Sequence, residues 1–476
     1  MISFIVSVVL LFIGWFLYSR VVEKVFCPDD RQTPAIAIND GVDCTPLKAP
    51  KAFLIQLLNI AGTGPIFGAL MGAEFGPCVF LWIVFGSILG GAVHDYMVGM
   101  ISCRNEGKSI AELSGIYLSD TAKWIMRLFS ILLLLLVGAV FVTSPAALIA
   151  RLTPKVMSSE FWVCIIIIYY ALATILPINK LIGKLYPLFG IVLIIMAVGI
   201  IGSLIISKDY TLPEITLSNL HPENKPVWPY MFITVACGAI SGFHATQSPM
   251  ISKCITKEKS GRNVFYGAMI AESIIALVWA AAGVTFYKTT GSLSEALSNF
   301  GQSGVVYDIS FKLMGTVGGI LAIIGVVICP ITSGDTAFRS ARLILAEWTG
   351  LEQKQLKNRL IITIPLLCAG ALLTQLDFDV LWRYFAWSNQ TLATIALFVA
   401  TAYILKSNKN KFYSLITALP ATFMMAVTST YILMADEGFK LKNYFAYPIG
   451  IGCTAVVFIW YLLILKKSTK KAENKL

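Results

Sequence analysis

Charged side chains are scarce in this sequence. Asp, Glu, Lys and Arg make up 13% of the 476 residues, and 57% of the residues are hydrophobic. A typical soluble domain has about 25% charged residues, and the mean hydropathy of +0.77 agrees with a non-aqueous environment. The composition therefore excludes a soluble enzyme, a secreted disulfide scaffold and a disordered segment. It indicates a polytopic membrane protein.

Residues and motifs for several kinds of chemistry are also missing. The chain has three histidines, no H-E-x-x-H motif and no C-x-x-C pair among its ten cysteines, so we expect no metal, no cofactor and no enzymatic activity. The absence of a G-x-x-x-x-G-K-[ST] loop excludes an ATP-driven pump. The net charge of +11 is dispersed among loops and does not form a basic face with aromatic residues, which excludes a nucleic-acid partner.

Long apolar runs fill most of the chain. Runs of about 20 apolar residues match a helix that crosses a hydrocarbon core of ~30 Å, and they are too long for transmembrane β-strands. We expect helices that cross the lipid bilayer at thirteen places: 2–19, 53–73, 78–101, 124–150, 160–177, 183–206, 228–250, 264–286, 311–337, 358–375, 380–404, 412–434 and 446–465.

The basic residues are divided unequally between the two sides of these spans. Of the 37 Lys and Arg residues, 25 lie in the loops of one side and the C-terminal tail, 7 lie in the loops of the other side, and the rest fall within span ends. Lys and Arg are enriched in cytoplasmic loops. We therefore predict a multi-pass protein of the cytoplasmic (inner) membrane, with the N-terminus outside and the C-terminus in the cytoplasm.

Two spans contain helix-breaking residues in their interior. Span 53–73 contains Ala61-Gly62-Thr63-Gly64-Pro65, and span 228–250 contains Gly238-Ala239-Ile240-Ser241-Gly242-Phe243-His244 followed by Pro249. Close helix packing through small residues is one interpretation of either break. However, each broken span begins a run of five, and the two runs enter the membrane from opposite faces. Paired breaks of this kind mark the central site of secondary transporters.

These spans divide the chain into six parts. The predicted parts are an N-terminal transmembrane helix (1–22), a cytoplasmic loop (23–52), a first five-helix repeat (53–206), an inverted second repeat (228–405), two C-terminal helices (412–465) and a basic cytoplasmic tail (466–476).

Several stretches resemble the carbon starvation protein A (CstA) family. They are Pro28-Asp29-Asp30-Arg31-Gln32-Thr33-Pro34-Ala35 with Asn39-Asp40-Gly41-Val42-Asp43, then Ile60-Ala61-Gly62-Thr63-Gly64-Pro65, Gly90-Gly91-Ala92-Val93-His94-Asp95-Tyr96-Met97, and Ala236-Cys237-Gly238-Ala239-Ile240-Ser241-Gly242-Phe243-His244-Ala245. The resemblance implies an all-α polytopic membrane protein of about 13 helices with a LeuT-like (APC-type) 5+5 inverted repeat. It also implies uptake of peptides or of pyruvate, with proton coupling for pyruvate.

Under the LeuT-like interpretation, the two breaks form the substrate site. Backbone N–H groups around Gly62, Thr63 and Gly64, together with the positive end of a half-helix, can bind a carboxylate. Ser241, Gly242 and the neighbouring Phe243 form the matching break. Such a site suits a small anionic or zwitterionic substrate.

His244 and Glu272 are candidates for proton coupling. His244 lies in the second break, and imidazole changes its charge in the physiological pH range. A neutral histidine that bonds to the freed carbonyl groups is the alternative. Glu272 lies deep in span 264–286, where an ionisable group is costly and is a functional candidate by default. Its alternative is a structural pair with a neighbouring helix.

Asp95, Asp335, Thr332 and Ser333 are further candidates for proton or ion coupling. Both carboxylates lie near the inner ends of their spans, so pairs with Arg104 (for Asp95) and Arg339 (for Asp335) are the alternative. The two hydroxyls correspond in position to those that face the first core helix in sodium-coupled LeuT-like carriers, which raises a cation site as an option. Hydrogen bonds to the preceding helical turn are the alternative.

The first cytoplasmic loop is rich in charge. Asp29, Asp30, Arg31, Asp40 and Asp43 lie in it, and the spacing of the acidic residues differs from that of an EF-hand. We predict a salt-bridged lid or gate next to the first broken span.

The predicted function is secondary active import of a small carboxylate, pyruvate, by proton symport with alternating access. Peptide uptake by a transporter of the same family is the alternative, and a channel or a transporter-like sensor is a third possibility. A channel would need a ring of repeated pore-lining residues, whereas an inverted pair of broken spans favours alternating access. The oligomeric state and the choice between H⁺ and Na⁺ stay open.

Overall fold

Helices make up nearly all of the regular structure. A computed structural model describes residues 1–41, 43–153, 157–175, 178–353, 355–408 and 410–473. Within these residues there is no β-strand, and one isolated backbone bridge joins Leu47 to Ile255. The all-α prediction is therefore confirmed.

The helical bundle is built from seventeen helices within the described residues. They are α1 (Ile2–Ile13), α2 (Ser19–Phe26), α4 (Ala49–Ile60), α5 (Ala69–Gly72), α6 (Val79–Gly86), α7 (Ala92–Arg104), α9 (Asp120–Leu152), α10 (Ser159–Ile175), α11 (Ile178–Ile206), α12 (Val227–Thr234), α13 (Gly242–Ser252), α14 (Gly267–Phe286), α15 (Thr290–Thr349), α16 (Leu356–Leu373), α17 (Phe378–Ser407), α18 (Leu415–Met434) and α19 (Asn443–Glu473). The short helices α3 (Pro34–Ala37) and α8 (Ile110–Tyr117) lie between spans.

Several spans contain a π-helical turn. The turn η1 (Gly14–Tyr18) joins α1 to α2, and η4 (Ser87–Gly91) joins α6 to α7. The turn η2 (Gly64–Gly68) leads into α5, and η6 (Arg262–Tyr266) leads into α14. Such turns interrupt the regular i→i−4 ladder and are frequent at functional sites.

The helices agree with the predicted spans. Ten helices in the described part of the chain are long and apolar enough to cross a membrane, and the α4–α5 pair, bent by 60°, makes an eleventh span. Of the other two predicted spans, 228–250 falls on the α12–α13 pair and 160–175 falls on α10, while residues 176–177 of predicted span 160–177 lie outside the described residues.

One difference concerns the segment before predicted span 311–337. Residues 290–310, expected in a loop, are helical in the structure and form the first part of α15. Gly301 and Gly315 each have a φ of 66° inside α15, a backbone conformation that glycine adopts at little cost. These two glycines therefore separate the span itself from the shorter helical pieces that precede it.

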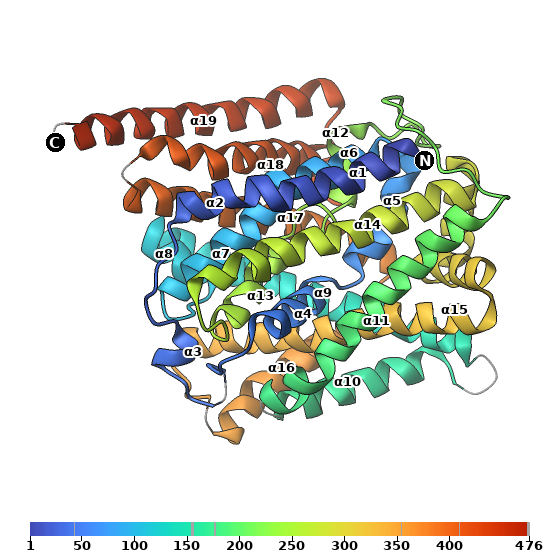
Figure 1. Cartoon of the computed structure of the whole chain (residues 1–476), viewed down its shortest axis with the longest axis horizontal. Helices are drawn as coiled ribbons and strands as arrows, with labels where there is room; N and C mark the ends of the chain where they lie inside the picture. The colour runs from blue at the N-terminus through green and yellow to red at the C-terminus, as the bar shows by residue number, and fades with distance from the viewer. Residues whose placement is uncertain (42, 154–156, 176–177, 354, 409, 474–476) are drawn as a thin grey trace.

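The long helices run side by side, and the short broken helices lie among them. Figure 1 shows α4 and α13 in the middle of the bundle, with α18 and α19 along one edge and α10 and α16 along the opposite edge. All eleven residues of α13 are buried. The N-terminus and the end of α19 lie at opposite ends of the bundle (Figure 1).

Loop contacts define the two ends of the bundle. At one end, the backbone N–H of Ser3 donates to the Glu214 carboxylate over 2.8 Å, which places loop 207–226 beside the start of α1. At the other end, the N–H of Leu47 donates to the carbonyl of Cys254 over 2.9 Å. The loop after the first span therefore lies against the loop that follows α13.

Candidate transport site

The first break separates α4 from α5. Helix α4 ends at Ile60, Ala61 has a ψ of 72°, and the chain resumes in η2 after Thr63. A β-carbon at position 62 would overlap the ring of Phe141, and one at position 64 would overlap the side chain of Cys237. Both glycines are therefore required for close approach, and Gly64 brings the first break into contact with the second.

The second break separates α12 from α13 and is held by Asn389 on α17. Ser241 has an extended backbone and precedes the first residue of α13, Gly242. Its hydroxyl donates to Oδ1 of Asn389 over 3.1 Å, and the backbone N–H of Phe243 donates to the same oxygen over 2.6 Å. Asn389 thus binds an N-terminal amide of α13 inside the second break, which was predicted to form the substrate site together with the first break.

Aromatic rings close the space beside the two breaks. Phe141 makes edge-to-face contacts with Phe243 and Phe385 at centroid distances of 5.7 and 6.3 Å. The Thr63 hydroxyl and the Asn59 amide are buried, and neither has a hydrogen-bond partner among the described residues. These unpaired groups at the end of α4 are available to a polar substrate.

Four ionisable side chains form a buried chain that reaches the second break. Nδ1 of His94 lies 2.8 Å from Oδ1 of Asp95, and Nδ1 of His244 lies 2.9 Å from Oδ2 of the same carboxylate. On the other side of the imidazole, Nε2 of His244 lies 3.3 Å from Oε2 of Glu272 without the alignment of a hydrogen bond. All four side chains are fully buried. Helices α7, α13 and α14 supply them.

The arrangement can store and move one proton. When Asp95 is ionised, each histidine next to it donates its Nδ1 proton, because a carboxylate can only accept. The remaining proton then lies either on Nε2 of His244 or on the Glu272 carboxyl. A shift of that proton converts a neutral pair into an ion pair inside the bundle. Proton carriers in transporters are built from such Asp, Glu and His chains.

The predicted partners of the two aspartates have different outcomes. Asp95 does not pair with Arg104, because α7 turns its carboxylate inward to the two histidines while Arg104 binds Glu258. Asp335 lies 4.0 Å from Arg339 on the same helix. This contact supports the predicted pair of Asp335 with Arg339. The predicted pair of Asp95 with Arg104 is wrong.

Thr332 and Ser333 face different partners. The Thr332 hydroxyl donates to the carbonyls of Ile328 and Cys329 in the preceding turn, as the structural alternative predicts. The Ser333 hydroxyl donates to the carbonyl of Leu58 over 2.9 Å. Ser333 therefore faces the first broken helix, one turn before its break.

The cytoplasmic loop is held down by a buried carboxylate. Glu258 accepts two hydrogen bonds of 2.9 Å from Arg104 and one of 2.9 Å from the backbone N–H of Asp29. Arg31 pairs with Asp29 at 2.6 Å and lies 3.6 Å from Glu258. The hydrogen bonds to Arg31 hold the pKa of the Asp29 carboxyl well below its usual range. The charged residues Asp29 and Arg31 of the first loop are therefore salt-bridged or hydrogen-bonded to the start of the α14 span at Glu258, and their role as a lid or gate stays a prediction.

An acidic vestibule opens at the other end of the bundle. This cavity of about 560 Å³ is lined by five carboxylates and two basic side chains; they are Glu74, Glu223, Asp379, Asp436 and Glu437, with Lys225 and Arg383. Lys225 pairs with Glu223 at 2.6 Å, and Arg383 pairs with Glu437 at 3.4 Å. The cavity therefore presents a net negative charge.

Ring contacts connect the vestibule to the first break. Trp382 lines the cavity, and its ring centroid lies 5.3 Å from that of Phe385. Phe385 in turn contacts Phe141, whose ring packs on Gly62. Trp382 also contacts Phe67 in η2 at 6.2 Å. A layer of aromatic side chains thus separates the vestibule from the broken helices.

Sequence reasoning missed three residues of this site. His94 was noted only as the neighbour of Asp95, although two adjacent ionisable residues inside a span are a signal in themselves. Asn59 is a polar residue beside the Gly62–Gly64 break, which the same rule would have found. The role of Glu258 depends on a contact with residues more than 150 positions away, so no local pattern indicates it.

The fold is similar to that of solved membrane proteins whose titles name transporters. A manganese transporter from Eremococcus coleocola is 13% identical with a TM-score of 0.55, and the match covers 91% of this chain and 99% of that one. A Na⁺-coupled sialic acid symporter is 14% identical with a TM-score of 0.52, covering 98% and 97%. The LeuT-like fold implied by the family resemblance is confirmed. At 13% identity, the likeness to the manganese transporter is one of fold.

The family follows from the sequence match. The family model described as carbon starvation protein CstA matches residues 1–159, 146–296 and 280–431, and the chain belongs to this family. A peptide transporter CstA from Helicobacter pylori is 27% identical, with 87% of this chain and 79% of the relative aligned. A peptide transporter CstA from Bacillus subtilis is 24% identical, with 97% and 94% aligned. An uncharacterized membrane protein from Haemophilus influenzae is 41% identical over 63% of this chain. The protein is a multi-pass membrane transporter of the CstA family.

Proposed function

We propose that this protein is a proton-coupled secondary importer of the bacterial cytoplasmic membrane that works by alternating access. The observation that carries the proposal is the buried chain from His94 through Asp95 and His244 to Glu272, in which His244 belongs to the broken span. We place the N-terminus outside and the C-terminus in the cytoplasm, as the distribution of Lys and Arg predicts. The acidic vestibule then opens to the outside, and the Glu258 contacts close the cytoplasmic end.

Coupling follows from the position of the mobile proton. A proton that enters from the vestibule side changes the charge of the His244–Glu272 pair. Because His244 belongs to the first turn of α13, that change alters the attraction between the second break and its neighbours on α7 and α14. Proton loading and movement of the broken helix are thus linked, which is the requirement for symport.

A substrate that carries an ammonium group, such as a peptide, fits the vestibule best. Five carboxylates against two paired basic side chains attract a cation or zwitterion and repel an anion. The relatives from Helicobacter pylori and Bacillus subtilis carry the name peptide transporter, which agrees with a peptide as the substrate. Pyruvate is the second candidate, because the unpaired Thr63 hydroxyl lies in a break whose amides can bind a carboxylate.

Uptake into proteoliposomes tests the proposal. Purified protein is reconstituted, and uptake of labelled dialanine and of labelled pyruvate is measured with and without an inward proton gradient. Accumulation of dialanine above the external concentration only with the gradient supports the proposal. If pyruvate accumulates with the gradient and dialanine does not, the substrate is pyruvate and not a peptide. Equilibration of either substrate without accumulation would contradict proton coupling.

A further inference from the structure

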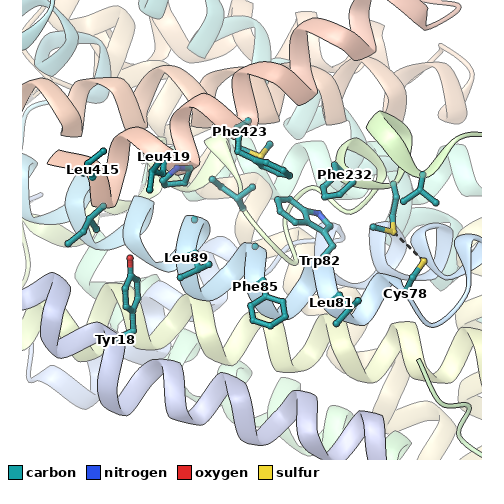
Figure 2. Close-up of a pocket in the computed structure, with 18 of the residues that line it drawn as sticks. Tyr18, Cys78, Leu81, Trp82, Phe85, Leu89, Phe232, Leu415, Leu419 and Phe423 are labelled. Atoms are coloured by element: carbon teal, nitrogen blue, oxygen red, sulfur yellow. Dashed lines mark hydrogen bonds between the residues drawn. The ribbon is translucent and has the colours of Figure 1, made fainter. Parts of the chain in front are cut away.

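A second cavity lies at the side of the bundle, away from both breaks and the vestibule. It has a volume of about 670 Å³, within the ~300–1,000 Å³ of typical ligand sites. Figure 2 shows α18, with Leu415, Leu419 and Phe423, on one side of it, and Tyr18 of the α1–α2 span on the other. Residues of α6 and η4 form its base. We name this cavity the lateral groove.

The mouth of the lateral groove belongs to the surface that faces the bilayer. Phe85 and Leu89 at the mouth are 48% and 46% exposed, and Leu419 across from them is 54% exposed. All three lie on helices that are long and apolar enough to cross a membrane. In the bilayer these side chains face lipid, so the groove continues the lipid-facing surface into the protein.

Small residues at the base of the groove leave its space unfilled. Gly86 and Gly90 of the α6–η4 segment lie at the bottom, and Pro420 of α18 faces Gly90. Ile240, fully buried, lies at the end of the second break and also lines the groove. A molecule that fills the groove would therefore touch the broken segment between α12 and α13.

The ends of the groove match an amphiphile. Tyr18 supplies a hydroxyl at the end where α18 begins at Leu415 (Figure 2). The remaining lining is almost wholly apolar, as the surface that receives an acyl chain must be.

We propose that the lateral groove binds one acyl chain of a phospholipid, which packs against Ile240 beside the second break while its polar headgroup lies at the Tyr18 end of the groove. The bilayer supplies this occupant at very high concentration. The site is independent of the substrate and of the coupling ion, so it can be tested without either.

The test is photolabelling in proteoliposomes by a phospholipid with a diazirine on its acyl chain, with mass-spectrometric mapping of the labelled residues. A bound chain labels the base of the groove, including Met231, Phe232 or Ile240. Leu89→Trp fills the groove from its mouth and is expected to reduce that labelling at least about threefold. The matched control is Ile195→Trp on α11, a position that is also exposed to lipid, and it is expected to leave the labelling unchanged.

Three outcomes would overturn the proposal. The first is labelling confined to exposed residues at a density equal to that around Ile195, as ordinary surface lipid would give. The second is labelling of the base that persists in Leu89→Trp. The third is chemical cross-linking through Leu419→Cys between two copies of the chain, which would make the groove a protein interface.

Discussion

The Asp95 carboxylate lies 2.9 Å from Nδ1 of His244, although 149 residues separate the two. Asp95 belongs to α7, which is continuous with η4 and α6, whereas His244 lies in the first turn of α13, directly after the second break. The contact therefore joins an unbroken span to a broken one. Any change in the charge of this pair therefore acts on the second break, the segment that the proposed alternating access requires to move.

Replacement of His244 tests whether this contact serves coupling. His244→Gln keeps a hydrogen-bonding side chain but cannot carry the charge of an imidazolium. We expect at least a tenfold loss of gradient-driven accumulation, by analogy with the ~10²–10⁴ effects of lost proton-transfer groups, while exchange of labelled for unlabelled substrate continues. The measurement is accumulation and counterflow in the same proteoliposomes. Equal loss of both activities would show that His244 only holds the structure.

Glu272 is expected to be the proton-binding end of the chain. Neither of its oxygens has a hydrogen-bond partner among the described residues, and the side chain is fully buried. Glu272→Gln removes a costly buried acid, so we expect unchanged or higher thermal stability together with loss of accumulation. The control is Asp308→Asn, whose carboxylate forms an exposed pair with Lys312 and is expected to alter neither property. A variant Glu272→Gln that still accumulates substrate against a gradient contradicts this role.

The sequence predicts the architecture well because the bilayer imposes simple rules. Apolar length and the distribution of Lys and Arg are local properties, so the thirteen spans fall on observed helices. The two breaks are also predictable, because Gly62–Gly64 and Gly238–Gly242 leave backbone groups that lipid cannot satisfy. These rules depend on composition within about 20 residues, and no distant contact is needed to apply them.

Partners across the bundle are not predictable in this way. Arg104 is the nearest basic residue to Asp95 in the sequence, yet α7 turns the two side chains in different directions, toward Glu258 and His244. Asn389 lies within predicted span 380–404, but its bond to the backbone of Phe243 depends on how α17 packs on α13. Both outcomes depend on tertiary packing, which a single sequence does not specify.

The Glu258 contacts are expected to act as the cytoplasmic gate. Loss of one partner from a buried ion pair costs about 3–5 kcal/mol, because the other charge stays buried. Glu258→Gln should therefore open this end. The measurement is maleimide labelling of Cys254, which is 1% exposed, in a protein that keeps only this cysteine. We expect Glu258→Gln to be labelled at least several-fold faster than the same protein with Glu258. The control is Lys259→Gln, next in sequence, whose pair with Asp30 is exposed and worth little. Equal labelling rates in both variants would contradict a gate.

His221 gives the protein a pH-dependent stability. Burial, and then the nearby Lys225 ammonium, lower the pKa of His221 to about 4, against ~6.5 in an unfolded chain. Above pH 6.5 both states are neutral and the full stability is present. As the pH falls from about 6.5 to 4, the unfolded chain binds a proton that the folded protein does not, so stability is lost.

The variant His221→Asn tests this dependence. Asn can still accept the hydrogen bond that Nδ1 receives from the backbone N–H of Glu223, but it does not titrate. Between pH 6.5 and 4.5, we expect His221→Asn to lose roughly 1 kcal/mol less unfolding free energy than the unsubstituted protein loses. Solvent screening reduces the effect, because His221 lines the vestibule. The measurement is thermal unfolding in detergent at the two pH values. Parallel pH profiles for the two proteins would contradict the assignment.

The vestibule charges are expected to select the substrate before it reaches the breaks. Asp379 accepts a hydrogen bond of 3.1 Å from Gln302, and both line the cavity. Asp379→Asn preserves the size of the side chain and removes one negative charge. We expect KM for dialanylamide, a cationic peptide, to rise about two- to fivefold at low salt, with a smaller change at high salt, because screening weakens attraction over these distances. KM for pyruvate should fall or stay constant in the same variant. An equal rise for both substrates would mean that Asp379 supports the cavity and does not discriminate between charges.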